Sequence, residues 1–263
     1  MYSEEHKAFI RKIRLNKFLI RTTQIMIIVC LIILWQLAAD KEWINTFISS
    51  SPKAIIDTVV NLYNDGSLFH HIWITFYEVF GSFILGTSIG IIIATILWRF
   101  KFLARVLDPY LTVLNSLPKV SLGPIIIIIA GAGTGSIIVM ALFISVIITI
   151  MDVHQAFINT DPNKVRLLQS FKATKRQIFF KLILPSNFKN IINVCKINTS
   201  LTFIGVIMGE FLVSKAGVGY LIMYGSQVFN LNLVVTGIIL LAIMASFMYY
   251  LILFIEKRLS KIR

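Results

Sequence analysis

Cysteine and acidic residues are scarce in this chain of 263 residues, and it has no long glycine-, serine- or proline-rich linker. Its two cysteines, Cys30 and Cys195, lie in apolar runs, which argues against the disulfide framework of a small secreted protein and favours packing roles. Charged residues make up 14% of the chain and hydrophobic residues 57%. This balance excludes an ordinary soluble domain and indicates an integral membrane protein.

Six apolar stretches approach the roughly 20 residues that one helix needs to cross a bilayer. They cover residues 22–39, 72–98, 108–130, 136–151, 191–208 and 233–255. Pro118, Lys119 and Pro124 interrupt the third stretch, and the fourth is short. No convincing small-residue cleavage site follows the first stretch, so we interpret it as a span and not as a cleaved signal. The prediction is an all-α polytopic membrane protein, with a basic segment at residues 1–21 before a single membrane domain at residues 22–263.

Basic residues outnumber acidic ones by 25 to 12, which gives a formal net charge of +13. They gather in alternate connections, at residues 7–21, 99–105, 160–185 and 257–263. The positive-inside rule therefore predicts that both termini and residues 160–185 are cytoplasmic. Because topology and anionic lipid account for the positive charge, a nucleic-acid partner is the weaker interpretation.

Residues 160–185 form a polar island in this apolar chain, and local signals predict that they fold as two helices joined by a turn. Asp161 can cap the first helix, with Pro162 at its first position. Thr174 and Gln177 have the spacing of a capping box, and we expect Pro185 to end the second helix. Residues spaced by three make one face of the first helix apolar: Val165, Leu168 and Phe171.

The order of these signals resembles a loop found in one family of membrane proteins. Asp-Pro at residue 161, a helix, Ala-Thr at residue 173, a second helix and Leu-Pro at residue 184 resemble the EAA loop of binding-protein-dependent ABC importer permeases. Residues 115–119 with Gly123-Pro124, and residues 209–211 with residues 216–220, look like the sulfonate, taurine and nitrate branch of that family. The order and spacing of the motifs, together with six spans, make the resemblance fairly specific.

The resemblance implies a type I importer fold in which two permease copies form the pathway and a coupling loop, at about residues 152–190, docks a separate ATPase. An external solute-binding protein would deliver the solute in a bacterial cell membrane. ATP and Mg²⁺ would be bound by the ATPase, and this chain would be neither an enzyme nor the holder of a cofactor. It has no G-x-x-x-x-G-K-[ST] motif, and Gly131 to Ser136 lack the lysine, so we interpret them as a tight turn. The residues implied in the coupling loop are Asp161, Pro162, Arg166, Leu167, Leu168, Phe171, Lys172, Ala173, Thr174, Gln177, Leu184 and Pro185.

The centre of the loop departs from the family pattern. Where the family usually has Glu-Ala-Ala and then Gly, this chain has Arg166, Leu167, Leu168 and Lys172. The reversed charge predicts a complementary acidic change in the ATPase. The rival interpretation is an amphipathic helix that lies on lipid headgroups. We favour a docking hairpin because two caps and a proline stop define a folded unit.

Polar residues inside the apolar stretches are the second candidate site, because each is costly unless it faces a cavity or a partner. Lys119 lies where broken helix geometry frees backbone groups, and it either attracts an anion or has a structural role. Glu210, expected near the outer face, either closes an external gate or caps its span in water; Glu78 is given no role. The residues assigned to a pathway or gate are Asn115, Ser116, Pro118, Lys119, Ser200, Thr202 and Glu210.

Three further features, a polar helix face, a stripe of small residues and the histidines, do not by themselves indicate a functional site. The polar face of the fifth stretch, from Asn193 to Thr202, either lines a path or joins helices. Ser82, Gly86 and Gly90 predict a packing stripe. His70-His71 and His154 have no spacing that recommends a metal site, so none is predicted.

The predicted function is a permease subunit of an ATP-driven importer for a small anion such as a sulfonate, taurine or nitrate. Related permeases carry vitamins or their precursors, and selectivity would lie largely in the binding protein. The alternative from another class is an ATP-independent secondary transporter or channel. Such transporters usually show inverted repeats and midplane acidic residues, which we do not find in the sequence.

Overall fold

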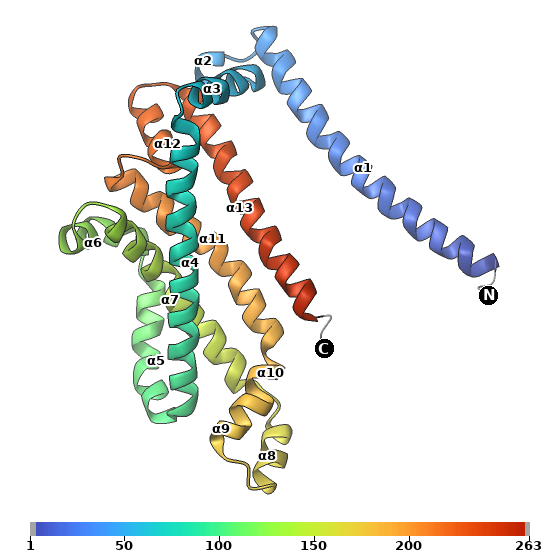
Figure 1. Cartoon of the computed structure of the whole chain (residues 1–263), viewed down its shortest axis with the longest axis vertical. Helices are drawn as coiled ribbons and strands as arrows, with labels where there is room; N and C mark the ends of the chain where they lie inside the picture. Colours follow the sequence, from blue (N-terminus) through green and yellow to red (C-terminus); the bar gives the residue numbers. More distant parts are fainter. Residues whose placement is uncertain (1–3, 261–263) are drawn as a thin grey trace.

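The computed structural model describes residues 4–260, and the side chains of residues 9–258. The described residues are helical with short connections, as predicted (Figure 1). Five helices are long and apolar enough to cross a membrane. They are α1 (Glu4–Asp40), α4 (Ser67–Arg99), α7 (Thr134–Ile158), α11 (Phe188–Val213) and α13 (Leu231–Ser260).

The third predicted span is strongly bent. It consists of α5 (Lys101–Ser116), the 3-10 turn η1 (Lys119–Leu122) and α6 (Gly123–Ala130), and its two halves meet at 89°. Pro118 lies in the break and Pro124 in the first turn of α6, in agreement with the predicted interruption. Counting this bent pair as one span gives six candidate spans in the described chain, which is the predicted number.

Shorter helices complete the chain. Two lie between α1 and α4, and they are α2 (Thr46–Ser49) and α3 (Pro52–Asn64). Between α7 and α11 the chain forms α8 (Pro162–Ser170), α9 (Lys175–Ile178), the π-helical turn η2 (Phe179–Ile183) and α10 (Leu184–Ser186). The last short helix, α12 (Val218–Gln227), connects α11 to α13.

Close packing of α4, α7 and α11 forms the centre of the molecule. Small residues permit it, because a Cβ atom added at Gly90 would lie 2.5 Å from Thr149 Cβ, and one at Gly205 would lie 2.5 Å from the backbone of Ala141. Gly86 faces Ser145 in the same way, which confirms the packing stripe in α4.

Two apolar clusters lie at different heights of this packing. The first joins α4, α7, α11, α12 and α13 through Val79, Ile137, Ala141, Phe203, Val206, Val218, Met244 and Met248. The second joins the other ends of α4, α7 and α11 to the segment after α8 through Ala94, Val153, Phe157, Ile178, Phe179, Ile183 and Val194. The second cluster explains one wrong prediction. The fourth span is not short, because α7 continues past Asp152 to bury Val153 and Phe157.

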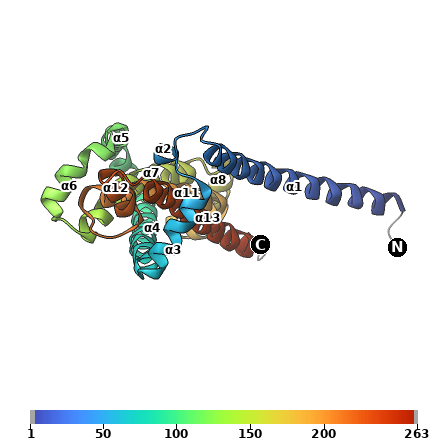
Figure 2. The ribbon, with the colours of Figure 1, turned by 90° about the horizontal axis from the view of Figure 1, so that it is seen from above.

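Helix α1 leaves the rest of the bundle (Figures 1 and 2). It packs mainly on α3, where the backbone N–H of Lys53 donates to Gln36 Oε1 at 3.0 Å. None of its apolar window is buried within the chain. The basic segment predicted at residues 1–21 runs without a break into this helix from Glu4 onward; residues 1–3 lie outside the described residues.

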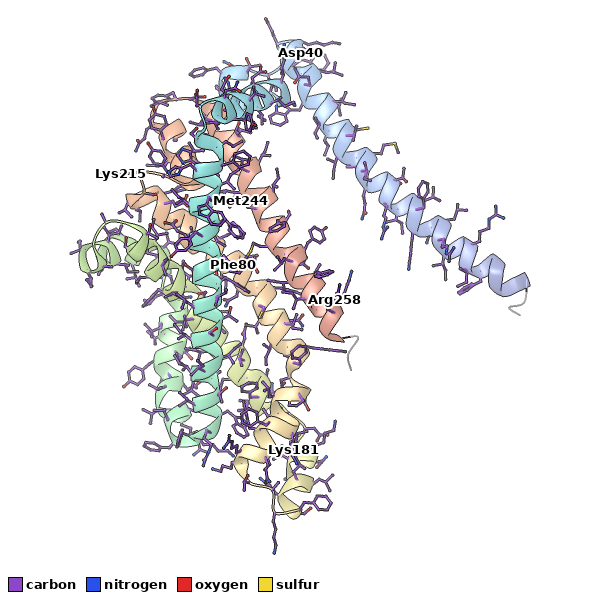
Figure 3. All side chains as sticks on the ribbon, viewed as in Figure 1. Asp40, Phe80, Lys181, Lys215, Met244 and Arg258 are labelled. Atoms are coloured by element: carbon purple, nitrogen blue, oxygen red, sulfur yellow. The ribbon has the colours of Figure 1, made fainter. Side chains whose placement is uncertain are left out.

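Basic connections gather at one end of the bundle. The α4–α5 connection and the segment from α8 to α9 lie together at the lower end in Figure 1. In Figure 3, Lys181 also lies toward that end, Asp40 and Lys215 lie toward the other, and Arg258 lies about halfway between them. The basic residues Lys261 and Arg263 lie outside the described residues. Two of the four predicted basic regions, the α4–α5 connection and the α8–α9 segment, therefore lie together at one end of the bundle.

Candidate functional site

Helices α8 and α9 form a hairpin whose two starts are capped as predicted. The Asp161 side chain accepts a hydrogen bond from the backbone N–H of Asn163 at 2.9 Å, and Pro162 occupies the first turn. The Thr174 N–H donates to Gln177 Oε1 at 2.7 Å, and the Gln177 N–H donates to Thr174 Oγ1 at 3.3 Å. These bonds complete the capping box and satisfy backbone donors that a helix start leaves free.

The turn of this hairpin is a Schellman motif centred on Lys172. Lys172 has φ +56°, the left-handed region that favours glycine. Its N–H donates to Gln169 O at 2.9 Å, and the Ala173 N–H donates to Leu168 O at 3.0 Å. The position at which the resembled family usually has glycine therefore adopts a glycine-like conformation here with a lysine side chain.

The apolar residues of α8 divide between two faces. Val165 and Leu168 pack against the second apolar cluster, as predicted. Phe171 was predicted on the same face, but its side chain is 74% exposed, because α8 ends at Ser170 and the chain then turns. Leu167 is also exposed, at 57%. The hairpin thus presents an exposed apolar tip among basic side chains, a surface that commonly binds another protein.

A buried hydrogen bond and the second cluster fix the hairpin to the spans. Asn187 Nδ2 donates to Thr160 Oγ1 at 2.7 Å and to the carbonyl of Ile183 at 2.9 Å. The Phe179 ring packs on Trp98 and Phe157 with centroid distances of 5.1 and 5.5 Å. These contacts join the hairpin to α4, α7 and α11.

Pro185 does not end the second helix of the hairpin, contrary to the prediction. The chain passes from α9 through the π-helical turn η2 into α10, where Pro185 lies in the first turn and its missing N–H costs little. Leu184 and Pro185 are partly buried at this junction. The helical path from the capping box to α11 is therefore almost continuous.

The second candidate site lies at the opposite end of α11, around Glu210. Its side chain is only 1% exposed, so it does not cap its span in water. It accepts hydrogen bonds from Thr75 Oγ1 at 2.5 Å, from the Gly219 N–H at 2.5 Å and from the Tyr220 N–H at 3.3 Å. A carboxylate at the start of α12 satisfies free donors and interacts favourably with the helix dipole.

Two further bonds hold the connection before α12. The Val218 N–H donates to Thr75 Oγ1 at 2.7 Å, and the Gly217 N–H donates to His71 Nδ1 at 3.0 Å. His71 therefore lies on α4 in contact with this connection. Added Cβ atoms at Gly217 and Gly219 would lie 2.5 and 2.6 Å from the Glu210 carboxylate, which explains glycine at both positions.

Glu78 is the feature of this site that sequence reasoning missed. It is 1% exposed, faces Glu210, and lies near Thr134. Neither of its carboxylate oxygens has a hydrogen-bond partner within the part of the chain that the structure describes. A second buried carboxyl group thus faces Glu210, and the two groups cannot both ionise without repelling each other. Its sequence signal was a glutamate inside an apolar stretch.

The remaining residues assigned to a pathway or gate do not share one site. Lys119 Nζ donates to Asn115 O and to Asn115 Oδ1, both at 3.0 Å, so it closes the last turn of α5. Asn115, Ser116, Pro118 and Ser200 are exposed, whereas Thr202 and Glu210 are buried in helix packing.

The polar face of the fifth span joins helices. Asn198 Nδ2 on α11 donates to Thr87 Oγ1 on α4 at 2.8 Å, and Thr202 Oγ1 donates to the Asn198 carbonyl. An ion pair of 2.7 Å between Lys196 and Glu256 fixes α11 to α13. The buried part of this face supports the interpretation as helix contact.

Comparisons with known proteins give a family. The family described as "Binding-protein-dependent transport system inner membrane component" matches residues 86–261. A putative aliphatic sulfonates transport permease protein of Bacillus subtilis is 25% identical over 233 residues, 89% of this chain and 84% of the relative. A formylaminopyrimidine transport permease protein of Halalkalibacterium halodurans is 23% identical over 190 residues, 72% of this chain and 75% of the relative.

A solved structure has the same fold. It is an inward-facing conformation of the MetNI methionine ABC transporter, with a TM-score of 0.63 and 21% identity. The match covers 74% of this chain and 95% of the compared chain. The similarity supports the predicted importer-permease architecture.

Proposed function

Because this chain belongs to the family of binding-protein-dependent transport system inner membrane components, we propose that two copies of it form the solute pathway of an ATP-driven importer. The chain itself is an ABC importer permease. A separate ATPase binds ATP and Mg²⁺ on the cytoplasmic side, and an external binding protein delivers the solute. Both termini and the α8–α9 hairpin are cytoplasmic in this proposal, because each of these segments is rich in lysine and arginine.

The hairpin is the docking element for the ATPase, and its exposed apolar tip is the observation that carries the proposal. Leu167 and Phe171 offer apolar surface to a groove, while Arg166 and Lys172 select a groove that bears acidic side chains. The Asn187–Thr160 bond and the packing of Phe179 make the attachment rigid. Closure of the ATPase therefore moves α7 and α11 as packed helices.

Docking is tested by copurification of the ATPase with the tagged permease. We expect Leu167→Asp with Phe171→Asp to abolish copurification, because both place a charge in an apolar contact. Lys164→Gln and Lys181→Gln on the same segment are the matched controls and should retain it. Full copurification with the double variant contradicts the proposed surface. Solute uptake by vesicles that contain the permease but no ATPase would instead indicate a secondary transporter or channel.

The charge reversal at Arg166 has its own test. The proposal expects poor coupling when this permease is combined with the ATPase of a permease that carries Glu-Ala-Ala in the loop. Arg166→Glu should improve that combination. Full coupled transport by the unmodified mixed pair argues against a complementary acidic groove.

A second copy of this chain is the proposed partner for part of α1. This helix has a long apolar surface, and none of its apolar window is covered within one chain. Lipid covers the remainder of that surface. Cross-linking of single cysteines placed along residues 22–39 in a Cys30→Ser, Cys195→Ser background would detect the dimer, and the absence of any dimer band in membranes would contradict it.

The proposed solute is a small anion of the sulfonate type, and the similarity to the sulfonate permease supports it. The similarity to the formylaminopyrimidine permease supports the alternative class of solute, a vitamin precursor. The test is the thermal stability of the binding protein encoded next to this chain, measured with taurine, an alkanesulfonate, nitrate and pyrimidine vitamin precursors. Stabilisation by a bound ligand follows its affinity, so the best solute raises the melting temperature most. A shift with the pyrimidines alone would exclude the sulfonate assignment.

A further inference from the structure

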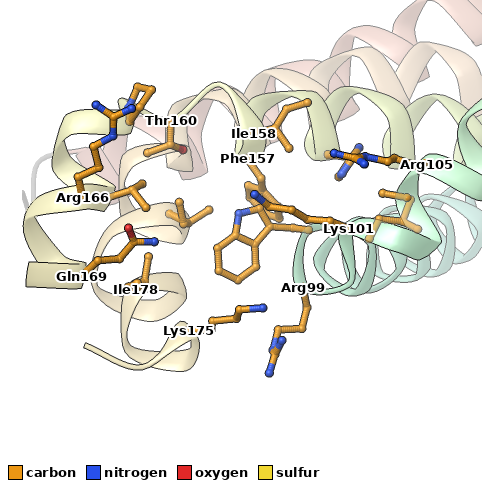
Figure 4. A pocket seen from close by; sticks show the side chains of 17 residues that line it. Arg99, Lys101, Arg105, Phe157, Ile158, Thr160, Arg166, Gln169, Lys175 and Ile178 are labelled. Carbon is orange, nitrogen blue, oxygen red and sulfur yellow. The ribbon is translucent and has the colours of Figure 1, made fainter. Parts of the chain in front are cut away.

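A cleft of about 700 Å³ separates the α8–α9 hairpin from the ends of α4, α5 and α7 (Figure 4). Arg99, Lys101 and Arg105 line one side, and Arg166 and Lys175 line the other. The lining includes no aspartate or glutamate. Five cations around one concave surface repel one another unless an anion lies between them.

The cations of this cleft have no acidic partner among the described residues, although the Arg99 guanidinium lies over the Phe100 ring at 5.4 Å. None of the five side chains has an ion pair or a hydrogen bond to another side chain within the part of the chain that the structure describes. The nearby carboxylate of Asp161 is already engaged in capping α8. The carboxylate of Asp108 interacts electrostatically with His154, which lines the cleft but is not one of the five cations.

Most of the remaining lining residues are apolar, with His154, Thr160 and Gln169 as polar exceptions, and several belong to the ends of membrane spans. Leu97 and Trp98 lie in the last turns of α4, and Phe157 and Ile158 end α7. The accessible part of this apolar wall is Trp98, which is partly buried, and Ile158, which is exposed; Leu97, Phe157, Ile178 and Ile183 are buried behind them. A cleft with cations and an apolar wall, at the depth where helices leave the bilayer, suits an amphiphile better than a free ion.

We propose that this cleft binds the phosphate headgroup of an anionic phospholipid from the cytoplasmic leaflet. The phosphodiester lies among Lys101, Lys175 and Arg99, and an acyl chain follows the apolar wall toward the bilayer. The cleft lies between the hairpin and the ends of α4, α5 and α7, beside the second apolar cluster, so the bound lipid adds to the contacts that hold the hairpin there. The inference uses the proposed cytoplasmic placement of this end but does not require the ATPase to dock there.

The test is lipid binding by the full chain purified in detergent without any ATPase. Native mass spectrometry and thermal unfolding are recorded with phosphatidylglycerol, phosphatidylcholine or inorganic phosphate added. We expect phosphatidylglycerol alone to be retained and to raise the unfolding midpoint. Lys101→Gln with Lys175→Gln should weaken its binding roughly thirtyfold, because each basic residue near anionic lipid contributes about a factor of five. Lys164→Gln with Lys181→Gln removes the same charge outside the cleft and should change binding little.

Equal loss of lipid in the two double variants overturns the proposal, because it shows attraction by net charge alone. Stabilisation by inorganic phosphate equal to that by phosphatidylglycerol also overturns it, in favour of a free phosphate. If the Lys101→Gln, Lys175→Gln variant does not fold, the test is quenching of tryptophan fluorescence in the unmodified protein by brominated phosphatidylglycerol. Quenching should exceed that by brominated phosphatidylcholine, and Trp98→Phe should remove the excess; an unchanged excess contradicts the site. Failure of ATPase copurification affects none of these outcomes.

Discussion

Thr75 on α4 donates its hydroxyl to Glu210 on α11 at 2.5 Å, and the same oxygen accepts the N–H of Val218 at 2.7 Å. One side chain thus connects three helices at the end of the bundle opposite the hairpin. Through Glu210 the connection extends to the first N–H groups of α12. The corner at which α11 passes into α12 is therefore fixed by buried polar contacts as well as by apolar packing.

Thr75→Val should test this corner, because valine has nearly the same shape without the hydroxyl. We expect a loss of about 2 kcal/mol in the free energy of unfolding, since Glu210 loses a donor and the Val218 N–H loses its acceptor. Thermal or denaturant unfolding in detergent measures the change. Thr95→Val is the matched control, because Thr95 Oγ1 bonds only to the carbonyl of Ile91 in its own helix. Equal effects of the two variants would show that the corner adds nothing.

Glu78→Gln should stabilise the protein by about 2 kcal/mol. The variant replaces one of two facing buried carboxyl groups with an amide that can donate to Glu210. The gain should grow as the pH rises and Glu78 ionises, because a protonated Glu78 can donate to Glu210 in the same way as the amide. Unfolding midpoints measured across pH give the result. Asp57→Asn, at an exposed position, is the control; a less stable Glu78→Gln protein would contradict the repulsion between the two groups.

Gly219→Ala should strongly destabilise the chain, by about 2–4 kcal/mol. The new Cβ atom would lie 2.6 Å from Glu210 Oε2, and the carboxylate cannot move without losing its donors. Gly135→Ala is the control, because no atom lies within 4 Å of its Cβ position and alanine favours the start of α7. The unfolding temperature should fall for the first variant and stay or rise for the second. Similar values for both would mean that Glu210 has room to move.

Lys172→Gly should stabilise the hairpin by about 1 kcal/mol, because glycine adopts positive φ without the clash of a Cβ atom. Protection of hairpin amides from hydrogen exchange measures the local effect. Ser170→Gly, in the last turn of α8, should lower protection, since glycine is unfavourable there. Lower protection in Lys172→Gly would contradict the cost assigned to the left-handed lysine.

Local features of the fold and the hairpin were open to prediction. Thr174 and Gln177 are three residues apart, and Asp161 acts on a neighbour two residues along the chain, so neither contact depends on the rest of the fold. Long apolar runs predict spans for the same reason. Local signals misjudged Phe171 and the end of α7, because there tertiary contacts or a chain turn override the helical period.

The sequence by itself determined a helical membrane protein with basic residues at one end and a capped hairpin in its longest basic connection, because hydropathy, charge and capping act over a few neighbouring residues. Only the tertiary structure decided that Glu210 meets Thr75, 135 residues away, that Glu78 faces it, and that five cations surround one cleft. These relationships depend on how α4, α7 and α11 cross, and the crossing follows from small residues packed against distant partners.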